Sequence, residues 1–199
     1  MTAAVAADGA RSQGDELLAR ARAGDAAAFG EIVREYQAPV YRAALAVLGS
    51  PAEAEDAAQD AFVAAFRRLA SFRGEAALKT WLVAIAWRKA LTRRRRLQWL
   101  RTRTAARTAR TDVDPIDLAV DPADGPQSAT LDAELRRQIR TLVRSLPSKL
   151  RDALLLVAGG DHSYDEAAAI LRVPVGTAKW RVAEARRVLR AKLRALGYR

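Results

Sequence analysis

The chain has 199 residues, half of them apolar, which is enough for one or two globular domains with their own cores. It contains no cysteine, which excludes disulfides, cysteine-ligated zinc and thiol catalysis. Its formal net charge of +11 favours a polyanionic partner, and no apolar run reaches the roughly 18 residues of a membrane span.

The two ends of the chain differ in composition and charge. Residues 1–14 lack the basic start and long apolar stretch of a secretory signal, so we expect a disordered tail and a cytoplasmic protein. Residues 131–199 hold 15 Lys or Arg against 7 Asp or Glu, and most of the basic excess therefore lies there. A nucleic-acid-binding element is expected in such a region.

The apolar residues recur almost everywhere with the period of a helix, so we expect an all-α protein. The first predicted domain, residues 15–96, contains four helices, of which the first covers about 15–23. Asp25 is placed to cap the second helix, and Gly49 is placed to end it.

The third predicted helix begins at Ser50 and Pro51, with Glu53 as the acid of a capping box. The fourth begins at about residue 75 and runs into four consecutive arginines. Their expected core residues are Ala58, Phe62, Ala65, Phe66, Leu69, Leu78, Trp81, Leu82 and Ile85.

Residues 97–130 are basic at first and then acidic, with three prolines and no periodic apolar face. Such a composition predicts a flexible linker. A second small helical domain follows over residues 131–199.

The second domain contains a stretch, SYDEAAAILRVPVGTAKWRVAEARR, that predicts two helices with a tight corner at Arg172 and Val173. Ser163 and Glu166 form a capping box that opens a helix over 164–171. Pro174 suits the first position of the next helix, which is basic. Two helices joined by so short a turn have the helix-turn-helix layout. An ordinary αα-hairpin with a solvated charged face has the same pattern.

An apolar stripe on the second of these helices determines which side chains face outward. Recognition helices present their first turns to base edges, and the flanking cations hold phosphates. The predicted base-facing residues are Thr177, Trp180, Arg181 and Glu184, and the predicted phosphate-facing residues are Lys179, Arg186 and Arg187.

Two longer stretches resemble a known family. AEDAAQDAFVAAFRRLASFRGEAALKTWLVAIA (54–86) resembles the second conserved region of extracytoplasmic-function (ECF) sigma factors, and LPSKLRDALLLVAGGDHSYDEAAAILRVPVGTAKWRVAEARRVLR (146–190) resembles their fourth. The resemblance implies a subunit without catalysis of its own that binds core RNA polymerase and helps to melt promoters. It implies that region 2 (15–96) engages the minus-10 element and that region 4 (131–199) reads the minus-35 element.

The resemblance also implies roles for individual side chains. Asp56, Gln59 and Asp60 match the family's contact with the polymerase clamp, and a merely solvated acidic patch is the alternative. Residues 72–82 match the segment that captures an unpaired minus-10 base. The minus-10 candidates are Arg73, Lys79, Trp87 and Arg88. Trp87 either stacks on DNA or covers a neighbouring helix.

The chain departs from the family pattern at three positions. Arg88 stands where Asn is usual, Thr92 where many members have Asp, and Trp180 where a small Ser is common. The base preference is therefore open.

The acidic part of the linker resembles the nucleic-acid mimic that threads polymerase in this family; its carboxylates are Asp112, Asp114, Asp117, Asp121 and Asp124. We expect a free monomer whose two domains move semi-independently unless an anti-sigma factor clamps them.

Other functions have little support. His162 is the only histidine, Ser163 is better explained as a cap than as a nucleophile, and no P-loop is present. We therefore expect no metal, no cofactor and no enzymatic activity. The alternatives are a stand-alone helix-turn-helix regulator and a basic RNA-binding or scaffolding protein that uses residues 93–110. Neither alternative needs the acidic cluster 53–60.

Overall fold

The computed structural model describes residues 15–105 (the first half) and 129–198 (the second half), and within these ranges all regular structure is helical, as predicted. The first half has a helix over 15–22, then α2 (Ala26–Leu48), α3 (Pro51–Arg68), the 3₁₀ turn η1 (Leu69–Ser71) and α4 (Leu78–Ala105). The second half has α5 (Ala129–Arg144), α6 (Ser148–Ala158), α7 (Tyr164–Leu171) and α8 (Val175–Ala195). The predicted tail (1–14) and the acidic linker residues lie outside the described ranges.

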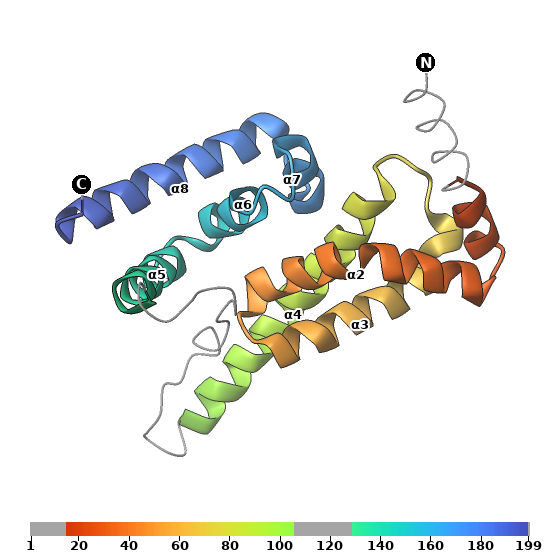
Figure 1. Cartoon of the computed structure of the whole chain (residues 1–199), viewed down its shortest axis with the longest axis horizontal. Coiled ribbons are helices and arrows are strands. Elements are labelled where there is room, and N and C mark those ends of the chain that lie inside the picture. Colours follow the sequence, from red (N-terminus) through yellow and green to blue (C-terminus); the bar gives the residue numbers. More distant parts are fainter. Residues whose placement is uncertain (1–14, 106–128, 199) are drawn as a thin grey trace.

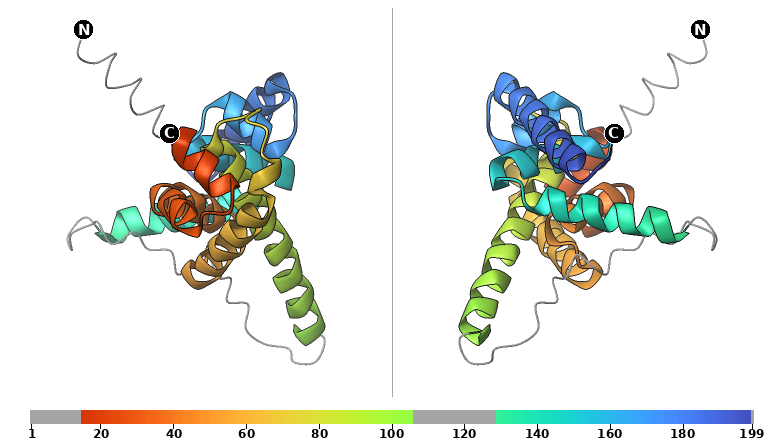
Figure 2. Two further views of the ribbon diagram at one scale, coloured as in Figure 1. Left: turned by 90° about the vertical axis from the view of Figure 1, so that its right-hand side faces the viewer. Right: turned by 90° about the vertical axis from the view of Figure 1, so that its left-hand side faces the viewer.

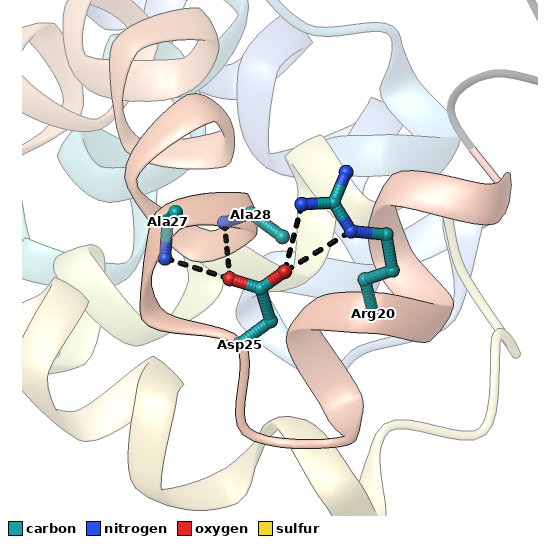
Figure 3. A network of polar contacts seen from close by, with 4 residues as sticks. All are labelled: Arg20, Asp25, Ala27 and Ala28. Atoms are coloured by element: carbon teal, nitrogen blue, oxygen red, sulfur yellow. Dashed lines mark hydrogen bonds and ion pairs between the residues drawn. The ribbon is translucent and has the colours of Figure 1, made fainter.

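The cap of α2 is the one that the sequence predicts. Asp25 accepts hydrogen bonds from the backbone N–H groups of Ala27 and Ala28 at 2.9 and 3.1 Å, and its other oxygen pairs with Arg20 (Figure 3). The Ala28 N–H, followed by Arg20, lowers the pKa of Asp25. The helix ends at Gly49, whose φ of 69° a glycine adopts without steric cost.

Two expectations about α3 are wrong. Ser50 makes no side-chain cap bond, and Glu53 pairs with Arg93 of α4 instead of closing a capping box. Phe66 is 41% exposed. The centroid of its ring lies 5.0 Å from that of Phe29 on α2, so it packs at the edge of the core.

α2, α3 and α4 pack around one core, in which Ile32, Leu69 and Leu82 are almost completely buried. The C-terminal part of α4 projects away from this core (Figures 1 and 2). Residues 97–105, expected to belong to the linker, continue the helix because this stretch has good helix formers and no proline. None of the helices in the described ranges is long and apolar enough to span a membrane.

The helix-turn-helix in the second half forms as predicted. Ser163 and Glu166 make both bonds of the capping box, at 3.2 and 2.8 Å, and α7 ends at Arg172, with φ of 54°. Pro174 is the N-cap of α8, one position before the predicted one. α6 and α7 both pack on α8, and Val182 and Ala185 are fully buried.

The two halves pack against each other in this structure, whereas their semi-independent motion in solution stays a prediction (Figure 1). Leu156 of α6 and Ala167 and Ile170 of α7 belong to the same buried cluster as the core of the first half. Removal of this apolar surface from water favours the packed arrangement.

Candidate nucleic-acid interface

The outward face of α8 carries the predicted DNA-reading side chains. Trp180 is 62% exposed, although it is a large aromatic residue. Lys179, Arg186 and Arg187 are exposed, and Thr177, Arg181 and Glu184 are partly exposed. The N-terminal turns of α8 thus present cations, an indole and a hydroxyl on one surface.

Two of these side chains bind each other. Arg187 donates to both carboxylate oxygens of Glu184, at 2.8 and 2.7 Å. This bidentate bond lowers the pKa of Glu184 and raises that of Arg187. The pair occupies the Nε and Nη2 groups of Arg187 and leaves its Nη1 group for other partners.

The charge of Arg181 acts on the carboxylate of Asp152, which was not among the predicted site residues. Asp152 of α6 is mostly buried, 3.7 Å from Arg94 of α4 and 4.0 Å from Arg151. Burial raises the pKa of Asp152, and the charges of Arg94, Arg151 and Arg181 oppose that effect. No sequence pattern marks Asp152, because only the tertiary packing brings Arg94 of the first half to it.

The predicted minus-10 residues do not all share one surface. Arg73 is exposed and Arg88 is partly buried, and both line a cavity of about 460 Å³. Lys79 instead donates to the backbone carbonyl of Asp161, at 2.9 Å. Its ammonium group is thus bound to the second half rather than held open for phosphate.

Trp87 is only 1% exposed, which corrects its prediction as a DNA contact. Its turn of α4 is covered because α4 packs on α2, α3 and α7. Trp81, which we expected in the core, lies at its edge. The ring is 5.0 Å from that of Phe72, and the side chain lines the cavity that Arg73 and Arg88 share.

The candidate polymerase-binding residues are exposed on α3. The Asp56 carboxylate is held by Arg93 of α4, at 2.6 Å, and Arg93 also binds Glu53. These carboxylates, Glu53 most of all, raise the pKa of Arg93. Gln59 and Asp60 have no polar side-chain partner among the described residues.

No group of three or more His, Asp or Glu side chains in the described part of the chain lies close enough to hold a metal ion. His162 is 7% exposed, and its Nδ1 atom has no hydrogen-bond partner. Burial, followed by the charge of Lys79, lowers its pKa. Its surroundings are those of a neutral, packed imidazole at the boundary between the halves.

Each half of the chain is similar to a known protein region. Residues 32–100 match the sequence model of sigma-70 region 2, and residues 136–189 match that of sigma-70 region 4. The chain is 32% identical over 196 residues to the RNA polymerase sigma-H factor of Pseudomonas aeruginosa, covering 94% of this chain and 96% of that protein. It is 34% identical over 188 residues to the ECF RNA polymerase sigma-E factor of Escherichia coli K12, covering 90% and 94%.

The solved structure of the sigma factor RpoE of Bartonella quintana, in complex with the anti-sigma factor NepR, matches with a TM-score of 0.61 and 25% identity. The match covers 83% of this chain and 96% of that one. The two matched regions lie in the order and helical setting predicted from the sequence. The chain therefore belongs to the sigma-70 family, as a sigma factor of the ECF type.

Proposed function

We propose that this sigma factor binds core RNA polymerase through α3, engages the minus-10 strand beside α4 and reads the minus-35 element with α8. The observation that carries the proposal is an exposed acidic and amide face on α3 in a chain with two basic surfaces. A protein that only binds nucleic acid has no use for that face, since it repels phosphate.

The contact with polymerase is assigned to Asp56, Gln59 and Asp60. Gln59 and Asp60 have no polar side-chain partner in the described ranges, so they can meet a basic partner without breaking an existing bond. Asp56 has to exchange Arg93 for a group on the polymerase. Exposed charges of this kind mainly direct and accelerate association.

The minus-35 contact is assigned to the N-terminal turns of α8. Arg181 is the candidate for a bidentate bond to guanine, a contact worth about 1–3 kcal/mol of discrimination. Thr177 and Trp180 flank it, and Trp180 offers apolar surface for a thymine methyl group or the backbone. Lys179, Arg186 and Arg187 are assigned to phosphates, where they add affinity without sequence information.

The minus-10 contact is assigned to Arg73 and Arg88, with Lys79 joining after it leaves the Asp161 carbonyl. Because Lys79 donates to the other half, it has to give up this hydrogen bond or use its remaining N–H groups to reach a phosphate. Bond making and breaking in RNA synthesis belongs to the polymerase, and no catalytic step is assigned to this chain.

An anti-sigma factor is a further proposed partner, because the matched RpoE structure contains one. We place the free protein in the bacterial cytoplasm as a monomer that joins polymerase one-to-one.

The test is co-elution with core polymerase on size-exclusion chromatography. The variant Asp56→Lys/Asp60→Lys should bind polymerase at least about tenfold more weakly, because it places two cations where the partner is basic. Glu31→Lys, an exposed charge reversal on α2, is the matched control and should bind normally. Wild-type co-elution of the double variant, with an unchanged helical circular-dichroism spectrum, would show that this face is not the contact.

If the chain were a stand-alone regulator, a different result would be expected with the same purified protein. It would bind its promoter specifically without polymerase, whereas a sigma factor directs run-off transcription only when polymerase is added. Specific footprints of the free chain on promoter DNA, with no transcription in the reconstituted mixture, would favour the regulator.

A further inference from the structure

The cavity of about 460 Å³ lies where the two halves meet. Its walls come from the loop after η1 (Phe72, Arg73), from α4 (Trp81, Arg88) and from α7 with its C-cap (Ala169, Arg172). The first half alone supplies only part of this wall. The volume is in the range of small-molecule binding sites, and the cavity is open to solvent on one side.

The cavity collects positive charge. Arg73, Arg88 and Arg172 line it, and none of the three forms an ion pair within the described ranges. Glu75 is the one carboxylate among the lining residues. Burial lowers the pKa of Arg88, and repulsion from Arg172 and Arg68 lowers it further. A bound anion would relieve this repulsion.

Arg172 is held rigidly in its place. It caps α7 with a φ of 54°, and its backbone N–H bonds to the carbonyls of Ala168 and Ala169. This left-handed conformation is strained for most residues other than glycine and asparagine, so the chain carries an arginine here at a conformational cost. The backbone of Arg172 is consequently fixed between two helices, and its exposed side chain lines the cavity from there.

An aromatic surface accompanies the arginines. Trp81 is only partly buried, lines the same cavity and is supported from one side by Phe72, 5.0 Å away between ring centroids. Guanidinium groups bind phosphate with paired hydrogen bonds, and an indole provides a stacking surface for any base. The arginines and Trp81 together match a ligand that carries both phosphate groups and a base.

We propose that this cavity binds a nucleoside polyphosphate in the free protein, with the phosphates on Arg73, Arg88 and Arg172 and the base against Trp81. Arg172 belongs to the second half and the other residues to the first, so the ligand stabilises the packed arrangement of the halves. It also competes with promoter DNA for Arg73 and Arg88. The competition rests on the proposed function, whereas binding to the free chain does not.

The test is calorimetric titration of the free full-length protein with GTP, GDP, inorganic pyrophosphate and guanosine, at near-physiological salt. GTP and GDP should bind more tightly than pyrophosphate or guanosine, because only they use both the arginines and Trp81. Arg172→Gly should weaken GTP binding by at least about tenfold, since a charged hydrogen-bonding partner is lost while the backbone conformation is favoured. Arg194→Ala, which removes an exposed cation from the far end of α8, is the matched control.

Several outcomes would overturn the inference. Equal GTP affinity for the wild type and Arg172→Gly would mean that nucleotide binds the general positive surface, and equal affinity for pyrophosphate and GTP would remove the nucleoside from the ligand class. Failure of all four probes to bind would also reject it. If Arg172→Gly lowers the melting temperature, Arg172→Asn keeps the test valid, because asparagine also adopts the left-handed conformation. These results are independent of polymerase co-elution, so either proposal can fail alone.

Discussion

At the scale of single residues, the Glu184–Arg187 pair shows how one carboxylate sets the behaviour of a DNA-facing cation. The two side chains lie one turn apart on the exposed face of α8 and share two hydrogen bonds. A cation already bound to a carboxylate releases fewer counterions on reaching a phosphate. With the DNA contact proposed for α8, Glu184 should therefore reduce its non-specific attraction for DNA.

Glu184→Gln should consequently raise affinity for random duplex DNA, most strongly at low salt. The slope of log affinity against log salt should steepen by about one phosphate contact, because Arg187 is set free. Fluorescence anisotropy between about 0.05 and 0.2 M salt measures this slope. Glu31→Gln on α2 removes the same charge away from α8 and should change the slope much less. An unchanged slope for Glu184→Gln would mean that Arg187 does not reach the backbone.

At the scale of elements, α8 has one face that is packed and one that is free. Its stripe is buried against α6 and α7, which holds the helix in one rotational setting. Arg181 lies at the edge of that stripe, partly exposed and near Asp152. Arg181, the residue proposed to read a base, therefore has the negative charge of Asp152 on a neighbouring helix acting on it.

Arg181→Ala should relax sequence preference at one minus-35 position, lowering affinity for the specific site by about 1–3 kcal/mol with little effect on random DNA. Lys179→Ala should weaken both kinds of DNA alike. Competition binding with a set of single-position site variants distinguishes these results. If Arg181→Ala lost as much affinity for random DNA as for the specific site, its contact would be with phosphate only.

At the scale of the whole molecule, polar bonds cross the boundary between the halves around the start of α7. Arg42 of α2 makes two bonds of 3.0 Å to the Asp161 carboxylate, and Thr80 donates to Glu166 at 3.3 Å. The Arg42 and Asp161 side chains are 51% and 34% exposed. Each such pair is worth at most about 1 kcal/mol, so the halves are held mainly by their shared apolar cluster.

Asp161→Ala should therefore loosen the packed arrangement without unfolding either half. A loss of up to about 1 kcal/mol corresponds to an increase of up to about fivefold in the separated population. Energy transfer between dyes on the two halves measures this population in the free protein. Asp165→Ala, an exposed carboxylate with no polar side-chain partner in the described ranges, is the control. Identical transfer in both variants would show that the Arg42 pair contributes nothing.

The same boundary should make stability depend on pH. His162 has a lowered pKa, first because it is buried and then because Lys79 and, more weakly, Arg42 oppose its protonation, while Glu166 and Asp161 favour it. As pH falls below the ordinary histidine value of about 6.5, the unfolded chain takes up the proton first. The contribution of His162 to stability is therefore present above that pH and is lost as pH falls towards the lowered pKa.

Urea unfolding between about pH 8 and pH 5 tests this dependence. The free energy of unfolding of the wild type should fall more steeply in acid than that of His162→Gln, which cannot gain the proton. Burial raises the pKa of Asp152, so this residue makes the free energy of unfolding rise as pH falls. It is present in both proteins and therefore does not affect the comparison. Parallel curves for the two proteins would mean that His162 is solvated when the chain is folded.

Sequence reasoning was most successful where a structure depends on neighbours along the chain. The Asp25 cap, the end of α2 at Gly49 and the capping box of α7 are each determined within one helical turn, and all three are observed. Reasoning of the same kind failed at Ser50 and Glu53 because Arg93, forty residues away, binds Glu53 more favourably than the cap does. The two predicted roles of Trp87 stayed open for a related reason, since helical periodicity does not reveal the helices that pack on α4.

The amino-acid sequence by itself determined the helical class, the two matched regions and the outward face of α8. These depend on periodicity, capping and residue type, which act over a few residues. Only the tertiary structure decided which of the exposed charges are free. Arg93 pairs with the Asp56 carboxylate, and Asp161 accepts from Arg42 on its carboxylate and from Lys79 on its carbonyl. Arg172 lines the same cavity as Arg73 and Arg88. Each of these pairings joins residues distant in the chain, and burial of Leu156, Ala167 and Ile170 against the first half brings several of them within reach.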